Sequence, residues 1–149
     1  RRAADMGLEG VVVDEPRAAV EGMDIVVTTV PPARDLVPFN RVAWLMEGAF
    51  ASLVDNGRSW MAEGFETIDY LLPDDHRQTA AMAANRNLPY QGTYHADLGE
   101  IVAGAKPGRR TAGERIVFLH PGVALCDLAV AALVYEEARS CKVGRGLPL

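Results

Sequence analysis

The sequence is poor in cysteine, in basic residues and in long apolar runs. Its 149 residues include two cysteines, and 15 Lys and Arg stand against 20 Asp and Glu, which leaves a net charge of −5. A negative balance argues against nonspecific binding to nucleic acid, which needs a basic face. No apolar run approaches the roughly 20 residues that span a bilayer, and no signal segment opens the chain. We therefore expect no nucleic-acid partner and no membrane partner.

The two cysteines, Cys126 and Cys141, fall within one expected helix. At a rise of about 1.5 Å per residue they lie roughly 22 Å apart, which is too far for a disulfide bond. Free thiols are typical of a reducing compartment, so we expect a cytoplasmic protein.

A glycine-rich phosphate-binding turn is also missing. No G-x-G-x-x-G or G-x-G-x-x-A motif follows any segment with the character of a strand, so the backbone amides that hold a dinucleotide pyrophosphate are absent. The chain starts at Arg1 without a methionine, and residues 1–8 resemble the end of a helix. These features indicate a piece of a longer protein. We expect no metal site, because His76 and His95 have no Cys or acidic partner at metal-ligand spacing.

The residues that are present have the composition of a globular α/β domain. Hydrophobic residues make up 49% and charged residues 23% of the chain, a balance that can build one core. Short β-branched runs alternate with helical segments, an order typical of a parallel sheet. The expected strands are residues 10–13, 24–30, 48–54, 67–72 and 116–118, and the expected helices are residues 16–21, 59–64, 75–86, 97–102 and 123–141.

The last of these strands leads into the longest helix. The strand stops at His120-Pro121-Gly122, and residues 123–141 contain neither Pro nor Gly and are rich in Ala, Leu and Glu, which favours helix. The apolar stripe of this helix is wider than a solvated face requires. We therefore expect a mostly buried helix, which a partial sheet can cover on one side only. Asp127 falls in its first turns, where the helix dipole favours a carboxylate.

Several motifs in this order resemble the second half of the ornithine cyclodeaminase and mu-crystallin family. They are MDIVVTTV at residues 23–30, AWLMEGAF at 43–50, LGEIVAG at 98–104 followed by KPG, VYE at 134–136 and LPL at 147–149. The resemblance implies an α/β fold, with a partial Rossmann-like NAD(P)-binding domain and parallel sheet at residues 1–113. Residues 114–149 would then be a strand and a long helix that return to a second, mostly missing substrate and dimerisation domain.

The resemblance also implies functions for residues at the strand ends. Those implied to contact NAD or NADP are Thr28, Thr29, Ser52, Val54, His120 and Pro121, while Gly122 would contact the substrate. Asp55 is the candidate catalytic residue. Two departures from the family pattern bear on this assignment. The family's catalytic Asp falls on Gly57, two residues after Asp55, and the usual Ser-Val-Gly before the last helix is replaced by His-Pro-Gly.

Each of these residues also has a purely structural interpretation. Thr28 and Thr29 suit any strand, Asp55 begins an Asp-Asn-Gly turn, and His120 could simply pack at a turn. For the parent protein we expect an NAD(P)-dependent, homodimeric enzyme that transfers hydride at the α-carbon of an amino acid, in a deamination, cyclisation or imine reduction. The alternatives are a mu-crystallin-like cofactor-binding protein without turnover and an inactive truncated relative. This chain alone is expected to be inactive.

Overall fold

The computed structural model describes residues 2–85 and 88–147, and its centre is a parallel sheet of four strands. Each strand has four residues: β1 is Ile25–Thr28, β2 is Phe50–Leu53, β3 is Tyr70–Pro73 and β4 is Ile116–Leu119. Their order in the sheet is β1-β2-β4-β3, and every neighbouring pair is parallel. The expected α/β fold with a partial parallel sheet is therefore confirmed, with strands shorter than the sequence patterns predicted.

One face of the sheet carries the main hydrophobic core. Side chains of alternate strand residues point to this face because successive residues of a strand alternate between the two faces. Trp60 and Phe65, which are each 1% exposed, pack against these strand side chains, and so does Val42. The core residues contributed by the four strands are Val26, Ala51, Leu53, Leu71, Val117 and Leu119.

The opposite face is covered at one side only. The short helix α3, Leu98–Val102, begins with a capping box in which Asp97 accepts a hydrogen bond from the backbone N–H of Glu100, as its sequence predicted. It lies beside β3, where Ile101 packs against a small cluster of buried residues. Over β1 and β2 the same face stays open, and Ile25 and Val27 are 68% and 57% exposed.

A loop between α3 and β4 is closed on itself by Glu114. The Glu114 carboxylate accepts hydrogen bonds from the backbone N–H of Arg110 at 2.8 Å and from Arg110 Nε at 2.6 Å. These bonds hold the pKa of Glu114 below its ordinary value, the backbone bond contributing most. A further bond ties the loop to β3, because the Tyr70 hydroxyl donates to the Pro107 carbonyl at 2.6 Å.

The helix α2, His76–Asn85, follows β3 directly. Its start matches the sequence prediction, because the Asp75 side chain accepts a hydrogen bond from the backbone N–H of Gln78 at 2.6 Å. The predicted end at Arg86, the loop beginning at Asn87 and the last two residues of the LPL motif lie outside the described residues. The predicted helix at residues 59–64 is wrong; a 3₁₀ turn, η3, forms instead at Phe65–Thr67.

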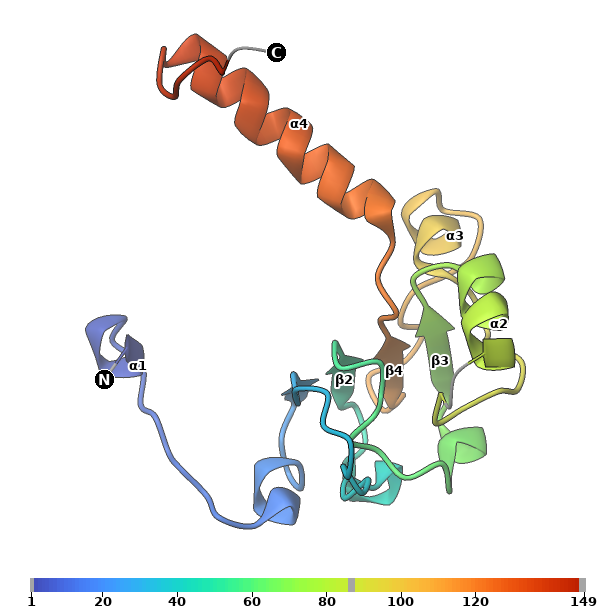
Figure 1. Cartoon of the computed structure of the whole chain (residues 1–149). Coiled ribbons are helices and arrows are strands. Elements are labelled where there is room, and N and C mark those ends of the chain that lie inside the picture. Colours follow the sequence, from blue (N-terminus) through green and yellow to red (C-terminus); the bar gives the residue numbers. More distant parts are fainter. Residues whose placement is uncertain (1, 86–87, 148–149) are drawn as a thin grey trace.

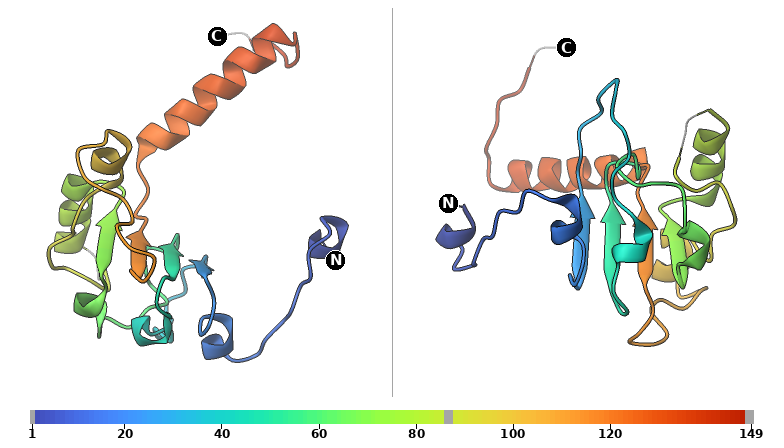
Figure 2. Two further views of the ribbon diagram at one scale, coloured as in Figure 1. Left: turned by 180° about the vertical axis from the view of Figure 1, so that it is seen from behind. Right: turned by 90° about the horizontal axis from the view of Figure 1, so that it is seen from below.

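The long helix α4, Ala124–Ser140, forms where it was predicted, but the expectation that it is mostly buried is wrong. It has no buried residue, and it projects away from the sheet in Figure 1 and in the left view of Figure 2. An apolar stripe indicates that burial of the helix would be favourable, but it does not show that the chain contains a surface to cover the helix. No described helix is long and apolar enough to cross a membrane.

The predicted strand at residues 10–13 is also wrong. These residues form no strand, and Val11 and Val12 are 77% and 94% exposed. The segment runs from the one-turn helix α1, Arg2–Asp5, to the 3₁₀ turn η1, Pro16–Ala19, at a distance from the sheet (Figure 1). A buried parallel strand needs a neighbouring strand for its backbone groups, and none of the described strands pairs with this one.

Candidate functional site

The carboxyl ends of the four parallel strands lie along one edge of the sheet. Backbone hydrogen bonds extend the ladder past the strand ends, from Asp55 N–H to the Thr28 carbonyl at 3.1 Å and from His120 N–H to the Leu53 carbonyl at 3.3 Å. The ends of β1, β2 and β4 are therefore adjacent, as a site at this edge requires. Side chains from segments far apart in the sequence can meet here.

Asp55 is enclosed at this edge by hydrogen-bond donors. Its carboxylate accepts bonds from Thr28 Oγ1 at 3.0 Å, from the Gly57 backbone N–H at 3.0 Å and from Ser59 Oγ at 2.6 Å. Trp60 Nε1 in turn donates to Thr28 Oγ1 at 3.1 Å. Asp55 is 4% exposed and Thr28 is 8% exposed. The carboxylate is positioned to hold the turn after β2 against the end of β1.

Gly57, onto which the resemblance carried the family's catalytic Asp, has a geometry that suits glycine. Its φ is +69°, in the left-handed region that residues with a Cβ rarely adopt. A Cβ here would lie 2.5 Å from Pro89 Cγ and 3.1 Å from Leu119 Cδ1. An aspartate at this position would need both the backbone and these neighbours to move.

The turn between β4 and α4 is held by side chains that sequence reasoning did not assign to the site. Asp74, which follows β3, accepts a hydrogen bond from the Gly122 backbone N–H at 2.6 Å. Gln78 donates to the Gly122 carbonyl. Gly122 has a φ of +87°, which explains glycine at this position. The only sequence signal for Asp74 was its place directly after a strand.

The other predicted site residues are more accessible, and they do not all share one face. Along β2, Ser52 and Val54 alternate with the buried Leu53, so they point to the open face of the sheet, opposite to Asp55. Val54 is 45% exposed, and Thr29 is also exposed. Pro121 is half-buried. The structure thus brings Thr28 together with Asp55, and separates this buried pair from the accessible residues.

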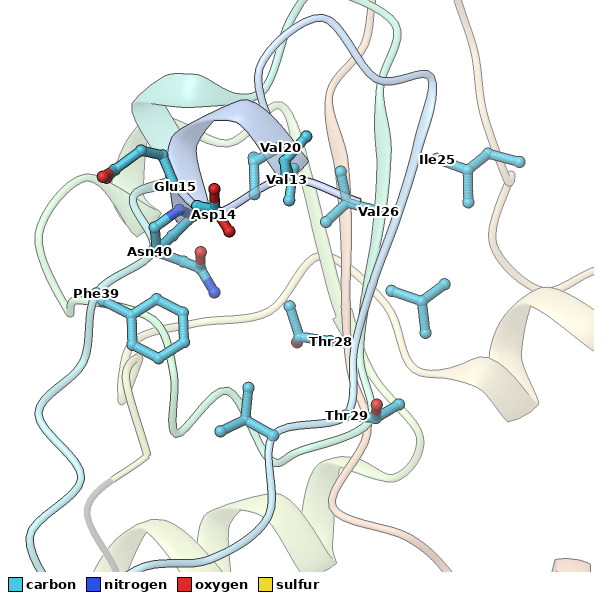
Figure 3. Close-up of a pocket in the computed structure, with 14 residues that line it drawn as sticks. Val13, Asp14, Glu15, Val20, Ile25, Val26, Thr28, Thr29, Phe39 and Asn40 are labelled. Atoms are coloured by element: carbon cyan, nitrogen blue, oxygen red, sulfur yellow. The ribbon is translucent and has the colours of Figure 1, made fainter. Parts of the chain in front are cut away.

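A cleft of about 460 Å³ runs beside β1, between that strand and residues 13–20 (Figure 3). Thr28 and Thr29 line it on one side, and Asp14 and Glu15 on another. The volume suits a small ligand. Of the residues that the structure describes, no Lys or Arg belongs to the lining, whereas the carboxylates of Asp14 and Glu15 do. This cleft is therefore a poor environment for a pyrophosphate.

One cluster with metal-ligating side chains was missed by sequence reasoning. His76, Asp97 and Glu100 place ligand atoms within 4.8 Å of one another, although His76 is more than 20 residues from the two carboxylates in the chain. His76 Nε2 lies 3.2 Å from Glu100 Oε2. Both carboxylates already take part in the capping box of α3, which accounts for their positions. The cluster is a structural contact between the starts of α2 and α3.

Comparison with known proteins places these observations in a family context. Alanine dehydrogenase of Archaeoglobus fulgidus is 29% identical over 148 residues, covering 94% of this chain and 44% of that protein. Ketimine reductase mu-crystallin of Mus musculus is 31% identical over 133 residues, covering 88% and 41%. The chain therefore spans less than half the length of these relatives.

Solved structures give the same result for the fold. An archaeal alanine dehydrogenase dimer with bound NAD has a TM-score of 0.70 at 25% identity, covering 99% of this chain and 47% of that one. Delta(1)-pyrroline-2-carboxylate reductase of Thermococcus litoralis, in complex with NADH and L-proline, has a TM-score of 0.71 at 25% identity, covering 97% and 47%. The model of the ornithine cyclodeaminase/mu-crystallin family matches residues 1–142, and the chain therefore belongs to that family.

Proposed function

We propose that this chain supplies one wall of the nicotinamide-cofactor and amino-acid site of an NAD(P)-dependent enzyme that transfers hydride at an α-carbon. The observation that carries the proposal is the common edge formed by the ends of β1, β2 and β4, where Thr29, Val54 and His120 remain accessible. Ligands of open parallel sheets bind at this edge. The solved relatives that contain NAD, or NADH with L-proline, support the choice of ligands.

The roles of the individual residues follow from their accessibility. We assign contacts with the cofactor to Thr29, Ser52, Val54, His120 and Pro121, and contacts with the substrate to Gly122. Thr28, which is buried, supports the end of β1 through Asp55. Asp55 remains the candidate catalytic carboxylate in this proposal. It is 4% exposed and already accepts three hydrogen bonds, which leave about one lone-pair site of the carboxylate for a proton.

The functional test is the replacement of His120 by alanine in the complete protein. We expect kcat/KM to fall by about tenfold or more while the free energy of unfolding changes by less than about 1 kcal/mol, because the side chain is 32% exposed at the proposed site. His76→Ala is the matched control, since His76 is similarly exposed and lies outside the proposed contacts. Unchanged kinetics together with a loss of several kcal/mol of stability would identify His120 as a packing residue.

The 149 residues alone are expected to bind NADH with a dissociation constant above about 1 mM. The sequence has no glycine-rich turn whose amides could hold the pyrophosphate, and the cleft beside β1 presents carboxylates to it. Isothermal titration calorimetry of this chain with NADH measures the affinity directly. Micromolar binding would mean that another part of the chain holds the pyrophosphate.

Gly57 favours a second candidate function, cofactor binding without turnover. The backbone at residue 57 and its contact with Pro89 disfavour the family's aspartate there, and the nearest carboxylate, Asp55, is enclosed. A protein of this kind would bind the nicotinamide cofactor and would not convert amino or imino acids. Steady-state assays of the complete protein with NADH and cyclic imino acids distinguish the two functions, because only the enzyme consumes NADH.

A further inference from the structure

His120 has one ring nitrogen that is shut off from solvent and lacks a hydrogen-bond partner among the described residues. This atom is Nδ1, in a side chain that is otherwise 32% exposed. A buried polar atom without a partner costs about 1–3 kcal/mol. A neighbouring group that accepts a hydrogen bond from Nδ1 would remove this cost.

Asp74 is that group. Its Oδ2 lies 3.6 Å from His120 Nδ1, and its side chain is 1% exposed. The two residues follow paired strands, because Pro73 at the end of β3 is in register with Leu119 at the end of β4. The separation is slightly too long for a hydrogen bond, and such contacts between functional groups commonly tighten when a ligand binds.

The Asp74 carboxylate is fixed in place independently of His120. It accepts hydrogen bonds from the backbone N–H groups of Asp75, at 2.9 Å, and of Gly122, at 2.6 Å. A carboxylate offers about four lone-pair sites, so it can accept a third donor. A fixed acceptor beside one ring nitrogen determines which nitrogen of a neutral histidine carries the proton.

We propose that Asp74 is a positioning residue for His120: it holds the proton on Nδ1 and thereby presents Nε2 as a hydrogen-bond acceptor for an N–H group of the bound ligand. The ring is also braced by Phe118, whose centroid lies 5.2 Å away. Phe118 and His120 are two residues apart on β4 and its extension, so both face the open side of the sheet. Nε2 is the polar ring atom left for that side.

This inference deepens the proposed function and rests on it for the ligand. An N–H donor could come from the carboxamide of the cofactor's nicotinamide or from the amino group of the substrate. The shared chemistry is a nitrogen-bound proton that points to an unprotonated imidazole nitrogen. The histidine tautomer itself can be measured without turnover and without an intact cofactor site.

The experiment is nuclear magnetic resonance of the 149-residue chain with ¹⁵N-labelled histidine, above about pH 8, where imidazole side chains are ordinarily neutral. In the wild type we expect His120 to show the tautomer with the proton on Nδ1. In Asp74→Asn we expect this preference to be lost. Asp75→Asn is the matched control and should leave His120 unchanged, because asparagine caps a helix as well as aspartate. A wild-type proton on Nε2 would overturn the proposal even if Asp74→Asn failed to fold.

The ligand is then tested with two small probes that need no phosphate site. Nicotinamide alone and L-alanine alone are titrated at high concentration while the His120 Nε2 resonance is followed. Movement with nicotinamide or with L-alanine supports the acceptor role and identifies the source of the N–H group. Movement with neither overturns the role of Nε2 as an acceptor. The proposed function fails separately, if His120→Ala in the complete protein leaves kcat/KM unchanged although the tautomer is as expected.

Discussion

Replacing Asp55 with alanine is expected to lower the free energy of unfolding by about 3 kcal/mol. The substitution leaves three buried donors, Thr28 Oγ1, the Gly57 backbone N–H and Ser59 Oγ, without their acceptor. It also weakens the tie between the end of β1 and the turn after β2. Urea unfolding followed by tryptophan fluorescence measures the effect, and Trp60 is a suitable reporter because it belongs to the same network.

Asp35→Ala is the control for the loss of a carboxylate, because Asp35 is exposed. We expect it to change the free energy of unfolding by less than about 0.5 kcal/mol. An Asp55→Ala chain as stable as the wild type would show that the network contributes little to the fold. The catalytic assignment would then be the remaining reason for an aspartate at this position.

Replacing Leu125, Leu128 and Tyr135 together with glutamine is expected to convert an oligomeric chain into a monomer. These three side chains lie on one face of α4 and are 72%, 66% and 61% exposed. A contiguous apolar surface of this kind marks an interaction site or an aggregation hazard. We therefore expect the wild-type chain to self-associate through α4.

Light scattering coupled to size-exclusion chromatography measures the mass of both proteins at tens of micromolar. Glu137→Gln is the control, because it introduces the same side chain on another face of α4. A monodisperse wild-type monomer would contradict the prediction and would mean that α4 folds back onto its own sheet. The open face over β1 and β2, with the exposed Ile25 and Val27, is the surface available for that contact.

Local patterns in the sequence predicted the elements whose causes are local. The β-branched runs at residues 24–30 and 116–118 became β1 and β4, and both are parallel strands as expected. Asp97 caps α3 through bonds to residues three positions away, and the Asp-Asn-Gly sequence at 55–57 forms a turn. The cap and the turn depend on a few neighbouring residues and therefore form largely independently of their tertiary surroundings.

Two wrong predictions, for residues 10–13 and for α4, concern burial, which depends on a partner surface, whereas the wrong helix at residues 59–64 is an error of local assignment. Residues 10–13 have the apolar character of a buried strand but pair with none of the described strands, and the broad apolar stripe of α4 is not covered by any part of the chain that the structure describes. Periodicity records which residues would be buried and says nothing about whether a second surface is present. The resemblance also assigned a cofactor contact to Thr28 and catalysis to Asp55, both of which require access to a ligand, whereas both side chains are buried in the structure.

By itself the sequence determined the parallel α/β class, the family and the segments that end at the carboxyl edge of the sheet. Only the tertiary structure decided which side chains meet there. Asp74 and His120 are 46 residues apart, and they come within 3.6 Å because β3 and β4 pair in register. Strand pairing fixes which ends are adjacent, and the alternation of side chains fixes which of them face inward. Neither the strand pairing nor the direction of these side chains can be predicted from the residues between Asp74 and His120.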